Sequence, residues 1–510
     1  MTLTFQNRAT IFLAAFAIAI VSQAEPYNEV VDEHGQLRKP YADFVENHYD
    51  AKKHGPERSQ ILFPTPLGAN SFLDRPLDDS IALLPTPVVL SEADYQLIQH
   101  SSAQRAKALA EFFNDVVLHN SERISKSGII SDSQIESIFN ADNDSRNLRW
   151  LRRVYGSNAH NGKINFWHGS DNVRDENGEF KIIEDNTGQL GGTGDIEATH
   201  TAFAKQLGLT LPKLKYPIEE AIERFLADIP KEHWADQVIA VVSSTDFDFS
   251  DLKLDDNEDY RQYLALKNLG LNVTTMSHLA EKSIDEIDKL RKVVSLYDIV
   301  TSRDKHNEIP LTLLGHFTTG QLEFMVSPGV DQISNKALLP YMDALIRFYL
   351  NEEPALKTAP TRIISLIDSL SDNCFSNDSK VVIKKTNACQ GSAVYIPHFM
   401  TEQQKAHLNK THIKNWMAWG AFNHYEDIPF FVSQDYIDQS YVPTTASGQS
   451  WVRFNVDFRP LNYVFHNEPN VKPLIWGRAN FKFPNYLTNV SRGAMESVVT
   501  TPHLCSHLLK

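Results

Sequence analysis

One hairpin-forming segment constrains the fold of this chain more than any other feature of its sequence. Residues 165–195 read NFWHGSDNVRDENGEFKIIEDNTGQLGGTGD, with Asn177 and Gly178 near the centre. Asn-Gly is the strongest short signal for a two-residue β-hairpin turn, and a turn centred between these residues places Asp171 opposite Glu184. Asn186 then points to the same face as Glu184, because side chains alternate along a strand.

The two opposed carboxylates indicate a metal site. Like charges directly across a strand pair are destabilising, and a divalent cation between them would convert that repulsion into binding. The oxygens of Asp171, Glu184 and Asn186 suit Mg²⁺, a hard ion that also keeps waters and substrate phosphates. A glycine-rich stretch, Gly188 to Gly194, follows and lets backbone approach a ligand closely. A solvated hairpin end with unpaired acids is the alternative interpretation.

The rest of the chain mixes helix and strand signals. Apolar residues at helical spacing from Gln104 to Val117 predict an amphipathic helix, in a segment for which Ser91 is a plausible N-cap. A strand at Val238–Val242, a helix at Glu258–Leu269 closed by Gly270, and further apolar residues after it predict an α/β unit.

Two lysines are placed to meet an anion. Ser334 is the predicted N-cap of a helix that has Lys336 in its first turn, and a helix N-terminus with a lysine beside it is a natural phosphate site. Lys384 ends a β-rich run before a loop that contains Gly391, and Lys385 is a second candidate. An exposed surface lysine is the alternative for Lys336.

Later segments add polar residues to apolar strands. Phe430 to Ile437 predicts a strand running into Gln434 and Asp435, with Asp438 in reach of a ribose hydroxyl. The alternating stretch from Trp451 places four polar side chains on one face: Arg453, Asn455, Asp457 and Arg459. Arginines that face a phosphate site would stabilise a transferring phosphoryl group. The alternative for the first segment is a buried strand leaving the core, and the alternative for each arginine taken alone is an ordinary surface residue.

The N-terminus and the charge balance limit where the protein acts and on what. An apolar run from Ala9 to Val21 ends in Ser-Gln-Ala, which is typical of a secretory signal peptide cleaved after Ala24 and is short for a membrane anchor. The protein is therefore expected to be exported to the periplasm or secreted, and not to be attached to a membrane after cleavage. The formal net charge of -15 argues against nucleic acid as a partner. The three cysteines form neither a zinc pattern nor a disulfide framework.

In this order, the segments resemble the circularly permuted ATP-grasp proteins, which include the glutathionylspermidine synthase-like carboxylate–amine ligases. The segments that carry the resemblance include SDNVRDENGEFKIIEDN, SPGVDQISNKALL, KVVIKKTNACQGSAV, FVSQDYI and NVSRGA, within roughly residues 75–500. The metal hairpin precedes both lysines here, whereas it comes last in ordinary ATP-grasp chains. The resemblance implies an α+β fold in which two α/β lobes clasp a nucleotide, with an N-terminal helical extension.

The resemblance also implies roles for individual residues. The nucleotide would be held by Lys336, Lys384, Gly391, Gln434, Asp435, Tyr436 and Ile437. Mg²⁺ would be held by Asp171, Glu184 and Asn186, and Arg453 and Arg478 would lie near the γ-phosphate as catalytic residues. The chain departs from the family pattern in three places: Lys385 stands where proline is common, the loop TNACQGSA is poor in glycine, and Gly169 stands where an arginine is expected.

The implied reaction is ATP- and Mg²⁺-dependent ligation of a small-molecule or peptide carboxylate to an amine through an acyl phosphate. The expected organisation is a signal peptide (1–24), an extension (25–75), a substrate and metal-hairpin region (76–330) and the ATP-binding lobes (331–510). ATP is scarce outside the cytoplasm, so an exported, non-catalytic binding protein on the same scaffold is the alternative. An enzyme delivered into another cell is a third possibility.

Overall fold

The structure is a computed structural model. It describes residues 26–48, 83–84, 86–139, 147–156, 161–188, 190–207, 217–243, 258–275, 278–279, 282–296, 299, 311–364, 380–388, 393–408, 431–446, 450–480, 488 and 494–503. Helices and strands are mixed along this part of the chain, as expected for an α+β protein. Within these residues, no helix combines the length and apolar character needed to cross a membrane. The predicted signal segment and Gly391 lie outside the described residues.

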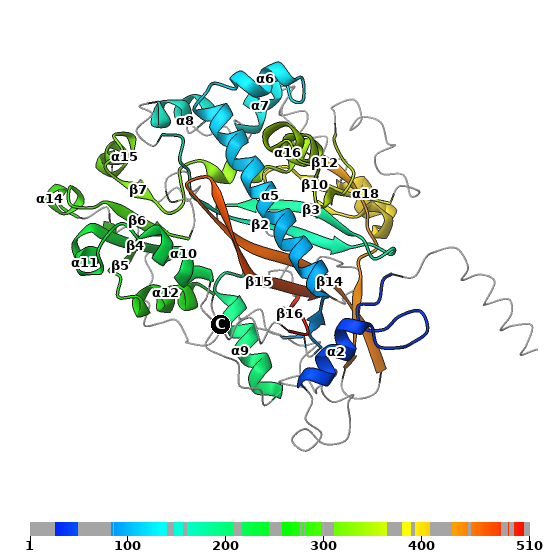
Figure 1. The fold of residues 1–510 in the computed structure, drawn as a ribbon. Helices are drawn as coiled ribbons and strands as arrows, with labels where there is room; N and C mark the ends of the chain where they lie inside the picture. Colours follow the sequence, from blue (N-terminus) through cyan, green and yellow to red (C-terminus); the bar gives the residue numbers. More distant parts are fainter. Residues whose placement is uncertain are drawn as a thin grey trace, which may run out of the picture.

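The central element is an eight-stranded sheet with the order β1-β16-β15-β14-β2-β3-β8, and β13 also pairs with β14 (Figure 1). Its strands are β1 (Val88–Val89), β2 (Phe166–Arg174), β3 (Phe180–Thr187), β8 (Lys357–Thr358), β13 (Tyr441–Ala446), β14 (Ser450–Phe465), β15 (Glu468–Asn480) and β16 (Met495–Thr500). Apart from the short pairings of β1 with β16 and β3 with β8, its neighbours are antiparallel. The predicted metal hairpin β2–β3 therefore lies beside strands from the C-terminal part of the chain.

Two smaller sheets flank this one. An antiparallel sheet has the order β11-β10-β12-β9 and comprises β9 (Thr361–Ile363), β10 (Val381–Lys385), β11 (Val394–Tyr395) and β12 (Phe431–Asp435). A parallel sheet has the order β5-β4-β6-β7 and comprises β4 (Val238–Ser243), β5 (Val273–Thr275), β6 (Lys292–Ser295) and β7 (Glu323–Phe324). In the second sheet, β4, α12 (Glu258–Asn268) and β5 form the predicted α/β unit, and Gly270 has a positive φ of 83° after the helix.

The long helix α5 (Glu92–Val117) crosses the face of the large sheet and joins the two hydrophobic cores (Figure 1). Its first turn is capped as predicted, because the Ser91 side chain accepts a hydrogen bond from the backbone N–H of Asp94. Ile98 near its start belongs to the core around β14 to β16, and Phe112 and Phe113 near its end belong to the larger core beside the parallel sheet.

The remaining helices cover the sheets and their edges. The α-helices are α2 (Lys39–His48), α6 (Glu122–Ser127), α7 (Asp132–Phe139), α8 (Leu148–Tyr155), α9 (Asp195–Leu207), α10 (Pro217–Phe225), α11 (Trp234–Gln237), α14 (Ile284–Ile287), α15 (Leu311–Thr318), α16 (Met342–Leu350) and α18 (Glu402–His407). The 3₁₀ turns are η1 (Lys231–His233), η2 (Val330–Ser334), η3 (Lys336–Tyr341) and η5 (Pro397–Phe399).

The predicted cap before Lys336 was wrong by one residue. Ser334 ends η2, and Asn335 caps η3 by accepting a hydrogen bond from the backbone N–H of Ala337. The Ser334 hydroxyl donates instead to the carbonyl of Asp331, back into its own turn. Lys336 still begins the helical turn, so its predicted position holds although the capping residue differs.

Candidate active site

The hairpin of β2 and β3 pairs Asp171 directly with Glu184, as predicted. The predicted two-residue turn is wrong, because Asp175 and Glu179 close a three-residue loop in which Gly178 has a positive φ of 81°. Such loops usually end in a left-handed residue, which glycine adopts without strain. On its own, the longer loop would shift the register by one residue and turn Glu184 away from Asp171.

A β-bulge inside the hairpin restores the predicted pairing. The register shifts just after the Asp171–Glu184 pair, and Ile183 is the extra residue on β3. Bulges re-aim groups beside active sites. The carbonyl of Ile183 accepts hydrogen bonds from Lys384 Nζ at 3.0 Å and from Gln434 Nε2 at 3.3 Å. The bulge therefore ties the metal hairpin to both strands predicted to hold the nucleotide, β10 and β12.

Both predicted lysines are buried beside the hairpin. Lys336 Nζ lies 2.9 Å from Glu184 Oε1 and also donates to the carbonyl of Ala388. Lys384, at the end of β10, is 4% exposed. Burial lowers the pKa of Lys384 to about 8, although the charge of Glu184 opposes this shift. The two lysines thus bring positive charge to a carboxylate that was predicted to bind a metal.

A cavity between the hairpin, the β10–β12 sheet and the strands β14 and β15 brings most of the predicted residues together. Asp171, Glu184, Lys384, Arg478 and the segment from Gln434 to Ile437 all line it. Its apolar lining consists of Val173, Ile183, Val382, Val394, Ile396 and Ile437. Gln439, Asn455, Asp457 and Thr488 complete the lining. Pockets that combine apolar walls with a few convergent polar groups are typical of small-molecule sites.

The segment predicted to hold a base is partly occupied by protein contacts. The backbone N–H of Asp435 donates to the carbonyl of Pro360, and that of Tyr436 donates to the carbonyl of Lys380. Both bonds anchor the end of β12 to neighbouring strands. A base entering the cavity therefore cannot use these two N–H groups, and other atoms of the segment would have to recognise it.

Two carboxylates and two guanidinium groups form a charge lattice on one face of β2, β14 and β15. Asp171 accepts two hydrogen bonds from Arg459, at 2.6 and 2.9 Å, and Asp457 accepts two from Arg478, at 2.7 and 2.8 Å. Arg478 Nη2 also lies 2.9 Å from Asp171 Oδ2. Both guanidinium groups lie near the ring of Trp476, at 5.5 and 5.3 Å from its centroid. All four charged residues are at most 7% exposed.

The lattice sets the protonation of its members. Burial alone would raise the pKa of Asp171, but the charges of Arg459 and Arg478 outweigh it and hold that pKa well below its usual range. Burial raises the pKa of Asp457, and the nearby charge of Asp171 adds to the increase. Burial works against the charge on Arg478, but the two carboxylates raise the pKa of that guanidinium. Asp171 is therefore fully ionised at neutral pH.

Sequence reasoning placed Asp457 and Arg459 on a polar strand face but did not include them among the predicted site residues. The signal was present, because the alternation along β14 places both on the face that also carries Asn455. The sequence did not reveal their partners, which come from β2 and β15.

Arg453 and Asn186 do not join this cluster, and Lys336 pairs with Glu184 without lining the cavity. Arg453 is exposed at the far end of β14, where its guanidinium lies 4.6 Å from the centroid of the Tyr441 ring. Asn186 does not line the cavity, and its Nδ2 donates to the carbonyl of Gly169 at 3.3 Å. Gly391 lies outside the described residues.

Gly169, where the family pattern led us to expect an arginine, makes room for Arg459. A Cβ at this position would meet Arg459 Cγ at 2.9 Å and Leu190 Cδ1 at 2.9 Å. The aliphatic part of Arg459 thus passes over Gly169 to reach Asp171. A guanidinium is therefore present beside the hairpin, but it comes from β14.

The residues predicted to bind the metal offer oxygen ligands that suit a hard cation, but arginine and lysine side chains already balance their negative charges. Across the described ranges, no cluster of three or more His, Cys, Asp and Glu side chains is arranged to hold a metal ion. The predicted set instead rests on two opposed carboxylates and an amide. Asp171 is paired with two arginines and Glu184 with Lys336. Carboxylate oxygens are suitable ligands for Mg²⁺. Binding of the ion would require the arginine and lysine side chains to move away from these carboxylates.

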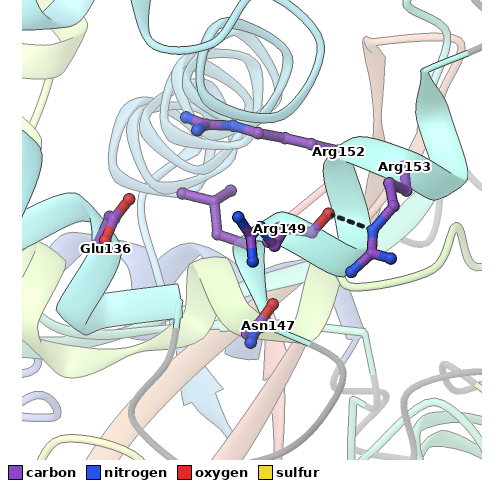
Figure 2. Close-up of a pocket in the computed structure, with 6 residues that line it drawn as sticks. Glu136, Asn147, Arg149, Arg152 and Arg153 are labelled. Atoms are coloured by element: carbon purple, nitrogen blue, oxygen red, sulfur yellow. Dashed lines mark hydrogen bonds between the residues drawn. The ribbon is translucent and has the colours of Figure 1, made fainter.

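A second cavity lies at α8 and has a different character (Figure 2). It is lined by Glu136, Asn147, Leu148, Arg149, Arg152 and Arg153. Arg152 donates to the carbonyl of Val116 and to the Ser121 hydroxyl, so its guanidinium joins α8 to the end of α5. The Asn147 side chain caps α8 by accepting from the backbone N–H of Trp150. This cavity contains none of the predicted site residues.

A comparison with models of protein families confirms the predicted family. The sequence profile described as circularly permuted ATP-grasp type 2 matches residues 87–229 and 294–473. An uncharacterized protein from Synechocystis sp. is 21% identical over 426 residues, which cover 80% of this chain and 81% of the relative. An uncharacterized protein from Mycobacterium leprae is 23% identical over 186 residues, covering 35% of this chain and 30% of the relative. Among solved structures, a glutathione synthetase-like effector from Globodera pallida in its apo form has a TM-score of 0.45 at 11% identity, covering 91% of this chain and 98% of that one.

Proposed function

Because the chain belongs to the circularly permuted ATP-grasp type 2 family and has that family's α+β fold, we propose that it is an ATP- and Mg²⁺-dependent ligase joining a carboxylate to an amine. The observation that carries the proposal is the cavity in which Asp171, Glu184, Lys384 and Arg478 meet, although they come from four different strands. ATP-grasp proteins generally act as ligases that use ATP with Mg²⁺, which supports the coarse assignment.

The lining of the cavity supports a nucleotide as its ligand. The adenine would lie among the apolar side chains of β10 and β11, beside the segment from Gln434 to Ile437. The phosphates would extend toward Lys384 and Arg478, whose side chains are buried and charged. Charged hydrogen-bond donors with little access to water bind anionic oxygens more strongly than exposed ones.

Asp171 and Glu184 would hold Mg²⁺, with Asn186 as a further oxygen ligand. The ion supplies neutralisation of phosphate charge when it is bound. Lys384 is held against the bulge carbonyl of Ile183 and would orient the phosphates, while Arg478 would face the transferring phosphoryl group. The substrate carboxylate attacks the γ-phosphorus and ADP leaves. The amine then displaces phosphate from the acyl phosphate and loses a proton, which gives the amide.

Calorimetric titration of the purified chain with ATP and Mg²⁺ tests this function. The wild type is expected to bind, and Lys384→Met is expected to lower the affinity at least about tenfold, since a hydrogen bond to a charged group contributes roughly 1.5–3 kcal/mol. Lys292→Met is the matched control, because Lys292 of β6 is also buried but pairs with Asp228, which follows α10, and with Glu323 of β7. Its affinity should equal that of the wild type. ADP release that requires both an acid and an amine would then identify the reaction.

A nucleotide-binding protein without turnover is the second candidate. It is favoured by the ion pairs of Asp171 and Glu184, which balance both carboxylates without a metal. Binding of ATP with no ADP release across a panel of acids and amines would identify it.

We also propose that the chain is exported, because its N-terminal residues have the pattern of a signal peptide. N-terminal sequencing of the mature protein after cell fractionation should begin at Glu25. An uncleaved chain in the cytoplasmic fraction would contradict export.

A further inference from the structure

The arginine that lines the proposed phosphate end is anchored unequally to its two carboxylates. Arg478 makes two hydrogen bonds to Asp457, from Nε at 2.8 Å and from Nη2 at 2.7 Å. It makes one contact to Asp171, from Nη2 at 2.9 Å. The two residues Asp457 and Arg478 are direct partners across β14 and β15, whereas Asp171 lies one strand further away on β2. Asp457 is therefore the principal anchor of Arg478.

Asp457 is itself held in place. The Thr488 hydroxyl donates to Asp457 Oδ2, and the carboxylate is 1% exposed. Asp171, by contrast, is shared between Arg478 and the bidentate Arg459. A divalent cation that takes the oxygens of Asp171 would thus remove one of three contacts from Arg478 and leave the bidentate pair with Asp457 intact.

We propose that Asp457 is a positioning residue that retains Arg478 in the cavity when a divalent cation replaces that arginine at Asp171. This inference rests on the proposed function. Without Asp457, Arg478 pairs with Asp171 alone and competes directly with the cation for that carboxylate. With Asp457 present, the guanidinium of Arg478 gives up its contact with Asp171 to the cation and remains on the cavity wall, where it contacts the phosphates.

The test measures the Mg²⁺ concentration at which a fixed amount of a non-hydrolysable ATP analogue is half bound. In Asp457→Asn this midpoint should rise about tenfold, because Arg478 then holds Asp171 against the cation. In the Arg478→Met background, adding Asp457→Asn should change the midpoint less than twofold, because Arg478 is gone and Arg459 competes for Asp171 equally in both variants. Thr488→Val should shift the midpoint in the same direction by a smaller factor, and it provides a second variant with the Asp457 charge intact.

Asp115→Asn is the matched control for the loss of a buried carboxylate. Asp115 is 1% exposed, accepts from the backbone N–H groups of Arg123 and Ile124, and does not line the cavity. It should destabilise the fold in thermal melts without moving the Mg²⁺ midpoint. An unchanged midpoint in both Asp457→Asn and Thr488→Val, or an equal shift with and without Arg478, would overturn the inference while nucleotide binding stands. A wild type that binds no analogue at any Mg²⁺ concentration would overturn the proposed function and the inference together.

Discussion

The protonation equilibrium of Lys384 would couple the proposed nucleotide binding to pH. Burial lowers its pKa to about 8, so the ligand-free site loses this charge as pH rises through that value. Phosphates favour the charged lysine, and binding above pH 8 must therefore take up a proton. We predict that the dissociation constant for ATP with Mg²⁺ rises by up to about tenfold between pH 8 and pH 9, the limit for one proton. Calorimetry in buffers of different ionisation enthalpy should detect the uptake, and a pH-independent constant with no uptake would contradict it.

The lowered pKa of Lys384 has the opposite effect on the stability of the ligand-free protein, which rises with pH where the affinity for ATP falls. The unfolded chain, with a lysine pKa of 10.5, binds more protons than the folded chain between about pH 8 and 10.5. The destabilising effect of burying Lys384 is therefore fully present below pH 8 and is relieved as pH rises toward 10.5. Lys384 is thus maintained at a cost in stability, as expected of a binding residue more than of a structural one.

Gly169 is predicted to be intolerant of any side chain, for steric reasons alone. In Gly169→Ala the new Cβ would lie 2.9 Å from both Arg459 Cγ and Leu190 Cδ1, and crowding of this kind typically costs about 1–3 kcal/mol. Chemical denaturation should show this loss of stability. Gly315→Ala is the control, because a Cβ there has nothing within 4 Å and alanine favours the helix α15. A neutral Gly169→Ala would mean that Arg459 does not cross that position.

At the scale of elements, the hairpin tip joins the N-terminal segment to the site. Gly178 has a φ of 81°, and a Cβ there would lie 2.8 Å from the Tyr27 ring. The backbone of this segment also pairs with β13, because Tyr441 donates to the carbonyl of Tyr27 and accepts from the N–H of Glu29. The N-terminal segment therefore holds the hairpin tip against the strand that follows the predicted base-binding residues.

We predict that Gly178→Ala destabilises the protein by more than Gly35→Ala does. Both positions have positive φ, at 81° and 73°, so both substitutions carry the backbone cost of roughly 1 kcal/mol. A Cβ at Gly35 has nothing within 4 Å, whereas one at Gly178 strikes Tyr27. The difference between the two unfolding free energies isolates this contact, and limited proteolysis should release the N-terminal segment faster only in Gly178→Ala. Equal losses would show that the contact contributes nothing.

Elements that depend on local signals were predicted correctly from the sequence. The turn and the bulge of the metal hairpin were not, and their effects on the strand register cancel. The capped helix α5, the α/β unit around α12 and the opposition of Asp171 to Glu184 follow from periodicity, caps and alternation. The turn is one residue longer than predicted, and the bulge at Ile183 compensates for it. No local pattern announces a bulge, and the groups that donate to the Ile183 carbonyl, Lys384 and Gln434, lie far away in the sequence. The pairing of Asp171 with Arg459 and Arg478 was also missed, because both arginines come from strands far away in the sequence.

At the scale of the whole molecule, the large sheet gives the site its composition. It places β2 and β3, from the middle of the chain, beside β14 and β15 near its end, and so brings Asp171 to Arg459 and Arg478. The cavity thereby sets the buried cations Lys384 and Arg478 among its carboxylates, within a protein whose formal net charge is -15. A nucleotide bound as proposed would meet repulsion at long range and the cations Lys384 and Arg478 at contact.

These two ranges respond differently to salt, which gives a kinetic prediction. Screening lengths fall from about 30 Å at 0.01 M to about 8 Å at 0.15 M ionic strength, so added salt suppresses the long-range repulsion first. The lattice and Lys384 are buried and are screened much less. We expect the association rate constant of ATP, measured by stopped flow, to rise roughly two- to threefold over this range, since steering by net charge is a rate effect. Adenosine, which is uncharged, is the control and should associate at a constant rate. An ATP association rate that falls with salt would show that the cations of the cavity outweigh the net charge during approach.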